Sequence, residues 1–217
     1  LQGPKALAIL QPLTGVDLSA MKYYRFADGD VLGEKAMVAR TGYTGEDGFE
    51  VTIASELGEK IARGLLEKGA GDGLKPTGLA ARDTLRLEAK MALYGNDIDD
   101  EHSVLEADLG WIVKWKKGEF LGRDALNQQK EEGVARKLVG FEMVDRGIAR
   151  HGYPAFVDGK PAGPVTSGSF VPYLKKNIGL VYLPAEACEE GTRFEIEIRR
   201  RRAEAVVVPT PFYKREK

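Results

Sequence analysis

Two side chains with chemistry to offer stand near opposite ends of a glycine-rich segment that runs from Ala39 to Val51. Tyr43 is a phenol that both donates and accepts hydrogen bonds, and Glu50 is a carboxylate that can accept two parallel N–H donors. Donors of that kind are found on an arginine and on the amidine-like edge of a pterin or purine. The segment therefore leaves two interpretations open: a hairpin with a solvated glutamate, or a site for a flat heterocycle.

Three glycines shape this segment. Gly42, Gly45 and Gly48 recur at every third position, and each can adopt φ > 0 or admit a close neighbour where other residues resist. An Asp-Gly pair ends the segment and indicates a turn, after which apolar and polar residues alternate. We therefore expect a half-buried strand with Phe49 in the core and Glu50 on the opposite face.

Three further residues are candidates to line the same site. Tyr23 offers an aromatic wall for a flat ligand, with ordinary packing as the alternative. Arg82 lies four residues before Arg86 on a predicted helix, where two like charges repel unless a negative group sits beside them. Arg82 has two alternative interpretations, as one partner of a structural ion pair or as a contact to a ligand. Trp111 is a candidate stacking ring, and hydrophobic packing is its alternative.

Composition argues against several classes of protein. The chain has 217 residues with 32 Lys and Arg against 33 Asp and Glu, whereas nucleic-acid-binding domains usually carry a basic excess. No run approaches the roughly 18 apolar residues of a membrane span, and the first residues do not resemble a signal peptide. Cys188 is the single cysteine, and His102 and His151 give no zinc-ligand spacing. We expect a cytoplasmic, metal-free protein that binds neither nucleic acid nor membranes.

An antiparallel sheet with helices must position these candidates. Residues 22–26 and 35–40 have strand-like composition and flank a polar turn predicted at 27–30. With the strand after Gly48 they predict a three-stranded antiparallel sheet. The sheet is preceded by a short amphipathic helix that Pro4 opens.

Two longer helices are predicted next in the sequence. Ser55 is a plausible N-cap for a helix over residues 55–68, in which apolar residues recur at helical spacing. Thr77 is a plausible cap for a second helix that ends at about Glu88 and carries Arg82. The first half of the chain therefore predicts an α+β fold.

The second half of the chain changes character. Residues 109–115 read as a strand, and residues 124–132 as a short helix. Short alternating runs separated by Gly and Pro then predict a small sandwich or barrel. They are residues 138–144, 153–157, 163–169, 178–183, 194–198 and 205–208. We therefore predict a first domain over residues 1–134 and a barrel domain over residues 135–217.

One run of charge stands out in the second half. Arg199 to Arg202 follow one of the predicted strands directly. The run is interpreted either as a solvated hairpin end or as an electrostatic landing site for an acidic carrier protein or a polyglutamyl tail. The sequence leaves both open.

Four blocks of the sequence, taken together, resemble the aminomethyltransferase (T protein) family of the glycine cleavage system. They occur in the family's order and extend over nearly the whole chain. The blocks are Gly42-Tyr-Thr-Gly-Glu-Asp-Gly-Phe-Glu50, Gly78-Leu-Ala-Ala-Arg-Asp-Thr-Leu-Arg-Leu-Glu88 with Leu93-Tyr-Gly-Asn-Asp97, Phe120-Leu-Gly-Arg-Asp-Ala-Leu126, and Thr210-Pro-Phe-Tyr213. The resemblance implies part of the family's ferredoxin-like folate-binding fold, followed by a small C-terminal β-barrel.

The resemblance also implies a reaction. Such an enzyme takes an aminomethyl group from the lipoyl arm of the H protein, releases ammonia and passes the methylene to tetrahydrofolate, its co-substrate, to give 5,10-methylenetetrahydrofolate. The alternatives are a folate-binding or carrier-docking module without its own catalysis, and a related folate-binding protein of amine oxidation or iron–sulfur assembly. In the transferase interpretation, Glu50 accepts hydrogen bonds from the donor edge of the pterin and Arg82 contacts the folate. Tyr43 and Tyr23 line the cavity.

Two expectations about the ends of the chain follow from the same resemblance. The closing block returns toward the ligand cavity, which makes Lys214 a candidate contact to the folate tail. The segment Gln2-Gly-Pro-Lys5 resembles a mid-chain motif of the family, so we expect the C-terminal portion of a T protein. The family's catalytic aspartate is expected upstream of Leu1, and this portion alone is expected to have little or no transferase activity.

Overall fold

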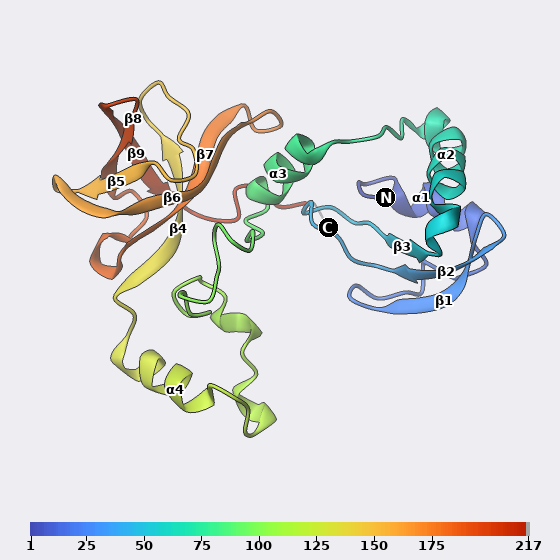
Figure 1. The fold of residues 1–217 in the computed structure, drawn as a ribbon, viewed down its shortest axis with the longest axis horizontal. Helices are drawn as coiled ribbons and strands as arrows, with labels where there is room; N and C mark the ends of the chain where they lie inside the picture. Colours follow the sequence, from blue (N-terminus) through green and yellow to red (C-terminus); the bar gives the residue numbers. More distant parts are fainter. Residues whose placement is uncertain (216–217) are drawn as a thin grey trace. The chain divides into compact units, whose positions relative to one another are not determined.

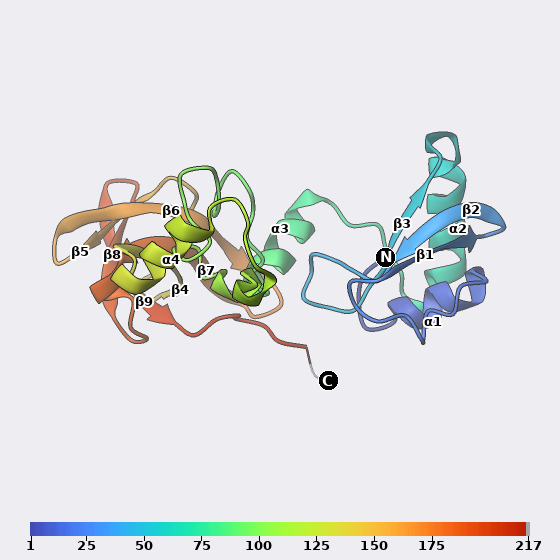
Figure 2. The same ribbon diagram turned by 90° about the horizontal axis from the view of Figure 1, so that it is seen from below.

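The computed structural model describes residues 1–215. Its internal contacts divide the described chain into two units, one of Leu1–Leu85 with Arg215 and one of Arg86–Lys214 (Figure 1). The first unit holds a small sheet with helices and the second a β-barrel, as both views show (Figure 2). This confirms the predicted α+β class with a C-terminal barrel. No helix within residues 1–215 has the length and apolar composition to cross a membrane.

The centre of the first unit is a three-stranded antiparallel sheet. Its strands are β1 (Phe26–Val31), β2 (Glu34–Ala39) and β3 (Glu50–Ile53), in the order β1-β2-β3. Successive side chains of a strand point to opposite faces. Accordingly Val38 and Phe49 are buried toward the helices, whereas Glu50 is exposed on the other face, as predicted.

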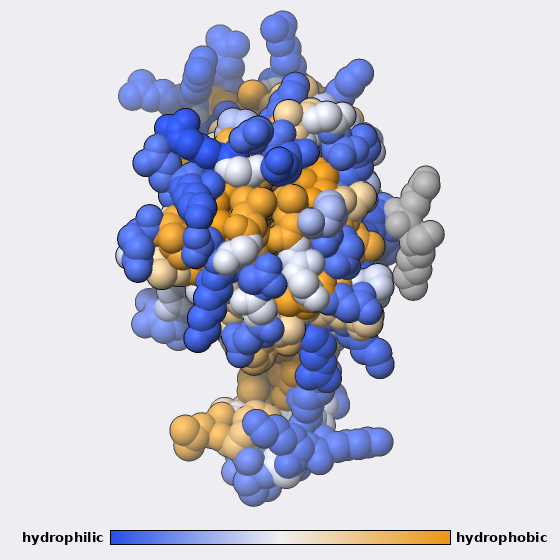
Figure 3. All heavy atoms as spheres, turned by 90° about the vertical axis from the view of Figure 1, so that its right-hand side faces the viewer, coloured by the Kyte–Doolittle hydropathy of each residue, from blue (hydrophilic) through white to orange (hydrophobic). Residues whose placement is uncertain are grey.

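Helices cover one face of this sheet. Those that contribute side chains to its apolar cluster are α1 (Ala6–Leu10), η2 (Ser55–Leu57) and α2 (Gly58–Gly69). The elements η1 (Gln11–Leu13) and η3 (Ala70–Asp72) belong to the same unit, and α3 (Leu79–Glu88) contains the division between the units. Leu10 and Ile61 pack with Val38 and Phe49 in one apolar cluster, and each such side chain stabilises the fold by about 1.5–3 kcal/mol. Apolar side chains also gather on the surface of this unit, surrounded by hydrophilic ones (Figure 3).

The predicted position of the first strand was wrong. Residues 27–30, predicted as a turn, lie inside β1, and the turn follows at Leu32 and Gly33, where φ is 52° and 78°. The acidic residues of β1 do not break it because they point to the open face, while Ala27 and Val31 point to the core. A Cβ on Gly29 would lie 2.4 Å from the Val16 side chain, so this strand packs too closely for a larger residue.

Two predicted helix starts also differ from the structure. Ser55 begins a 3-10 turn and bonds to Glu56 at 3.4 Å, so it is not the N-cap of α2, which begins at Gly58. Helix α3 begins at Leu79, after the predicted cap Thr77. Both helices nevertheless exist where helical periodicity predicted them, because the apolar spacing rather than the cap decides which face is buried.

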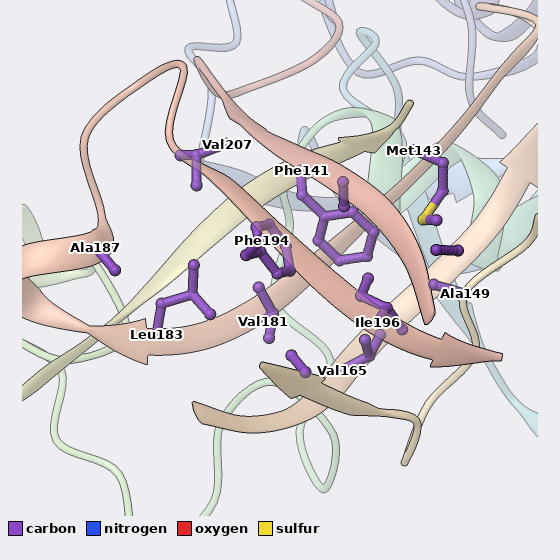
Figure 4. Packing of buried hydrophobic residues seen from close by; sticks show 13 residues of the cluster. Phe141, Met143, Ala149, Val165, Val181, Leu183, Ala187, Phe194, Ile196 and Val207 are labelled. Atoms are coloured by element: carbon purple, nitrogen blue, oxygen red, sulfur yellow. The ribbon is translucent and has the colours of Figure 1, made fainter. Parts of the chain in front are cut away.

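The second unit contains a closed six-stranded barrel. Its strands are β4 (Arg136–Met143), β5 (Pro154–Val157), β6 (Lys160–Val171), β7 (Lys176–Pro184), β8 (Arg193–Ile198) and β9 (Arg201–Val208), with a 3-10 turn η6 (Ala185–Ala187). All six predicted runs are strands. Phe141 and Phe194 meet edge to face inside the barrel, with ring centroids 5.6 Å apart (Figure 4). The barrel begins at Arg136, and the domain boundary between residues 134 and 135 stays a prediction.

The segment before the barrel is helical and irregular. Residues 109–115, predicted as a strand, form the 3-10 turn η4 (Gly110–Ile112), and η5 (Trp115–Lys117) follows. Positive φ at Asp108 (58°) and Gly118 (95°) turns the backbone on both sides, and no strand of the two sheets within residues 1–215 pairs with this span. Helix α4 (Arg123–Glu132) confirms the prediction at 124–132.

A buried ion pair anchors the end of α3 within the second unit. Arg86 and Asp97 are 2% and 0% exposed, and Arg86 Nη1 lies 2.6 Å from Asp97 Oδ2. The hydroxyls of Thr166 and Ser167 donate to Asp97 Oδ1 at 2.6 and 2.7 Å. Arg86 Nη2 donates to the Ser167 hydroxyl at 2.8 Å. The pair is thus enclosed by hydrogen bonds, which a charge away from water requires.

Candidate functional site

The glycine-rich segment forms an irregular loop between β2 and β3, and the Gln2 side chain lies against it. Gln2 Nε2 donates to the Thr41 carbonyl at 3.0 Å. A Cβ on Gly42 would lie 1.9 Å from Gln2 Oε1, and one on Gly48 would lie 2.4 Å from the same amide. Gly45 has φ of 79°. The glycines thus act in both predicted ways, two by admitting a close neighbour and one by its backbone conformation.

Arg40 and Asp47 join the two ends of this loop. Arg40 Nε donates to Asp47 Oδ1 at 3.0 Å and Nη2 donates to Oδ2 at 2.7 Å, a bidentate pair. The hydrogen bond from Arg40 lowers the pKa of the Asp47 carboxyl. Sequence reasoning interpreted Asp47 only as part of a turn and did not single out Arg40. Their place at the two ends of the glycine motif was the available signal.

Tyr43 projects from the loop and contacts Arg82 of α3. The guanidinium carbon of Arg82 lies 4.5 Å from the Tyr43 ring centroid, so the contact seen at Arg82 is a cation–π stack. Arg82 also lines a cavity of about 500 Å³ in the first unit, together with Gln2, Thr44 and Thr77. Two of the predicted site residues are therefore brought together beside a cavity.

Glu50 and Tyr23 lie close to the same loop. Glu50 is the first residue of β3 and is exposed, directly after buried Phe49. Burial raises the pKa of the Tyr23 hydroxyl, and the carboxylates of Asp47 and Glu50 raise it further. The guanidinium of Arg215 lies 5.6 Å from the Tyr23 ring centroid and 3.7 Å from Asp47 Oδ1. Tyr23, Asp47, Glu50 and Arg215 thus form one electrostatic group.

The two remaining predicted site residues, Trp111 and Lys214, belong to the second unit. Trp111 is 68% exposed in η4, so the alternative of hydrophobic packing is wrong for this ring. Lys214 is exposed and lines a groove of about 500 Å³ with Phe212 and Lys176. Phe212 itself packs against a buried cluster of the barrel unit.

The arginine run occupies the turn between β8 and β9. Arg199 and Arg200 form the turn itself with φ of 51° and 66°, a conformation that usually takes Asn or Gly. Arg202 lies over the Phe156 ring and 3.6 Å from Glu195, so it is held within the barrel wall.

A groove of about 760 Å³ lies beside this turn. Five arginines and one carboxylate line it: Arg146, Arg150, Arg199, Arg201, Arg202 and Asp145. We call it the arginine groove. Its lining is strongly basic, which fits an anionic partner.

No arrangement for a metal ion appears in the part of the chain that the structure describes. Within residues 1–215, no three His, Cys, Asp or Glu side chains are grouped to hold one.

Comparisons with known proteins match both halves of the chain. The family model for the GCVT N-terminal domain matches residues 1–117. The model for the glycine cleavage T-protein C-terminal barrel domain matches residues 136–214. The second match coincides with the closed barrel.

Curated relatives and a solved structure agree with these matches. The aminomethyltransferase of Geobacillus sp. (strain WCH70) is 51% identical over 219 residues, covering 100% of this chain and 60% of that protein. That of Symbiobacterium thermophilum is 54% identical, covering 99% of this chain and 58% of that protein. The crystal structure of glycine cleavage system aminomethyltransferase T from Bartonella henselae matches with a TM-score of 0.88 and 32% identity, over 98% of this chain and 58% of that one.

This chain thus spans about six-tenths of the length of the relatives it matches. Within that span the two family models match residues 1–117 and 136–214, the second of which includes the whole barrel. The chain belongs to the aminomethyltransferase (T protein) family of the glycine cleavage system.

Proposed function

We propose that this chain supplies the tetrahydrofolate-binding part of a cytoplasmic aminomethyltransferase. The reaction takes the aminomethyl group from the lipoyl arm of the H protein and transfers its methylene to tetrahydrofolate. Its products are 5,10-methylenetetrahydrofolate, ammonia and the dihydrolipoyl carrier. The observation that carries this proposal is the glycine loop, which presents Tyr43 against Arg82 and leads directly into Glu50.

In this proposal most of the chain's contribution is positioning. Holding the folate nitrogen beside the reacting carbon turns a bimolecular encounter into an oriented one. The Glu50 carboxylate accepts the N–H donors of the pterin edge, for which an exposed acceptor on a rigid strand is suited. Tyr43 and Tyr23 serve as walls or hydrogen-bond partners, and Arg82 as a counter-charge to a folate carboxylate.

The proposed roles of Trp111 and Lys214 belong to the second unit. The exposed Trp111 ring is available to stack on a flat ligand. The Lys214 ammonium offers a charge to the folate tail. Neither role depends on the geometry of the glycine loop, so each is tested separately by substitution.

The catalytic aspartate implied by the family resemblance is assigned to none of these residues. We infer that it lies in the part of the relatives' length that this chain does not span. This chain then binds folate but has little or no transferase activity alone. The alternatives are a folate-binding or carrier-docking module without its own catalysis, and a related folate-binding protein of amine oxidation or iron–sulfur assembly. Restoring the full-length chain discriminates the transferase from these alternatives, because activity returns only for a transferase.

The folate assignment is tested by calorimetric titration of 5-formyltetrahydrofolate into the wild-type chain and into Glu50→Gln. Loss of one charged hydrogen-bond acceptor predicts about 10-fold weaker binding or more. Glu67→Gln, an exposed carboxylate on α2, is the matched control and keeps wild-type affinity. Equal affinity of the wild type and Glu50→Gln would show that Glu50 does not contact the ligand. No binding by the folded wild type would contradict the folate assignment.

The arginine groove favours a second, partner-binding role. Its basic lining suits the acidic surface of a carrier protein such as the H protein. Charge reversal by Arg199→Glu with Arg201→Glu then weakens H-protein binding, and raising the salt from about 50 to about 500 mM weakens it in the wild type too. Arg63→Glu on α2 is the control. If H-protein affinity changed neither with salt nor with charge reversal, the arginine groove would be excluded as the binding site.

A further inference from the structure

We propose that Arg40 is a positioning residue that holds the glycine loop in the shape that presents Tyr43. Its effect on ligand binding rests on the proposed folate function, whereas its effect on the loop does not. Arg40 directly follows β2, and Asp47 lies at the far end of the loop, seven residues away. The ion pair between these two residues joins the two ends of the loop, and we call it the Arg40–Asp47 clasp.

The contact between Arg40 and Asp47 has fixed geometry. Its two N–H···O bonds, at 3.0 and 2.7 Å, run in parallel from one planar guanidinium to one carboxylate. Such a bidentate pair sets orientation as well as distance, which a lysine ammonium does not do. The two side chains are only 20% and 22% exposed, so water competes weakly for these bonds.

The remaining nitrogen of the same guanidinium, Nη1, bonds to backbone carbonyls of the buried core. Arg40 Nη1 donates to the Met21 carbonyl at 2.7 Å and lies 3.4 Å from the Leu18 carbonyl. Leu18 and Met21 are both buried, and the guanidinium carbon lies 5.5 Å from the ring centroid of buried Phe49. Arg40 therefore connects the loop to the packed interior of its unit and leaves little freedom at the loop's base.

The other positive group near Asp47 does not duplicate this role. Arg215 Nη1 lies 3.7 Å from Asp47 Oδ1 and its side chain is the more exposed of the two arginines. At that distance it contributes charge without a hydrogen bond. Arg40→Lys therefore keeps the local charge but removes the two-point contact with Asp47, together with the guanidinium's bonds to the Met21 and Leu18 carbonyls.

The first measurement is amide hydrogen exchange across residues 41–46. The free energy of opening a local segment sets the rate at which its amides exchange. Arg40→Lys should lower this free energy for the loop and speed its exchange about 5-fold or more. Exchange in α2 (Gly58–Gly69) stays as in the wild type. Arg63→Lys, which alters an exposed arginine of α2, leaves the loop unchanged. Unaltered loop exchange in Arg40→Lys would overturn the proposal.

A second variant keeps the test independent of any one substitution. Asp47→Asn removes the other partner, and the double variant with Arg40→Lys should speed loop exchange no more than the stronger single variant, because both break one clasp. Effects that multiply in the double variant would show that the two side chains act separately and would overturn the proposal.

Ligand affinity distinguishes a positioning role from a purely stabilising one, because a residue that only stabilises the fold does not change the affinity of the folded protein. In Arg40→Lys, affinity for 5-formyltetrahydrofolate falls about 10-fold under conditions in which urea unfolding shows that the variant is fully folded. Faster loop exchange with unchanged affinity would overturn the positioning role. Absence of folate binding by the wild type would overturn the proposed function alone, and loop exchange would still decide whether Arg40 holds the loop.

Discussion

Arg82 lies over the ring of Tyr43, with its guanidinium carbon 4.5 Å from the ring centroid. One residue comes from the glycine loop and the other from α3, so the contact joins two elements of the first unit. A cation over an aromatic face is attracted by the ring quadrupole, most strongly when water is excluded. The pair links the shape of the loop to the start of the helix.

A double-mutant cycle measures this contact. Arg82→Met and Tyr43→Leu each remove one partner, and the cycle should give a coupling free energy of about 0.5–1 kcal/mol, as for exposed cation–π pairs. Urea unfolding of the four proteins is the measurement. Tyr43→Phe is the control, since it keeps the ring and should keep most of the coupling. A coupling of zero would show that the stack adds nothing to stability.

The Gln2 side chain occupies the space that a Cβ at Gly42 would take. A Cβ at Gly42 would meet Gln2 Oε1 at 1.9 Å, so Gly42→Ala must displace the amide from the Thr41 carbonyl. Losing that hydrogen bond costs about 1 kcal/mol of unfolding free energy. Gln2→Ala should cost a similar amount, and the double variant little more than either single one, because the bond is lost only once. Additive losses in denaturant unfolding would contradict this.

The pKa of Asp47 predicts a defined pH dependence. Because Arg40 lowers the folded-state pKa of this carboxyl, the stability it contributes is fully present above its unfolded pKa, about 3.9. That stability is lost as the pH falls through the folded value. The difference in unfolding free energy between wild type and Asp47→Asn should therefore be constant from pH 7 to about 5 and narrow below about 4. A gap that widens in acid would reverse the sign of this assignment.

The buried pair of Arg86 and Asp97 predicts a large stability effect in the second unit. Asp97→Asn removes the charge of the carboxylate that pairs with the Arg86 guanidinium, which is 2% exposed, and should cost about 3–5 kcal/mol. Glu59→Gln removes one partner of an ion pair whose side chains are both 78% exposed, and should change stability by less than about 0.5 kcal/mol. Thermal or denaturant unfolding of both variants checks the contrast. Equal costs for the two would rule out burial as the cause.

Local pattern was enough to predict most of the barrel. In β8, Phe194 and Ile196 are buried while Glu195 and Glu197 between them are not, and this alternation is visible in the sequence itself. A strand with one face in a core must alternate in this way, because its side chains point to opposite faces in turn. Whether such strands close into a barrel or stack as a sandwich depends on pairing between distant strands, which alternation does not specify.

The two misplaced strands show where local pattern fails. Residues 22–26 and 109–115 both carry apolar and aromatic residues, yet neither is a strand over that range. Asp28, by contrast, lies within a strand because β2 pairs with it in register through Met37. A strand exists only when a neighbour accepts its hydrogen bonds, and a sequence read locally does not contain that neighbour.

For the candidate site, residue types and spacing were enough to predict the glycine loop, the side chains of Tyr43 and Glu50 on it, and the family that these blocks resemble. The bidentate pair of Arg40 with Asp47 and the stacking of Arg82 on Tyr43 became evident only in the folded structure. A turn and a strand depend on backbone preferences of adjacent residues, which are present in any short stretch. A contact between side chains distant in the sequence exists only after packing has brought their elements together, and packing is a property of the whole fold.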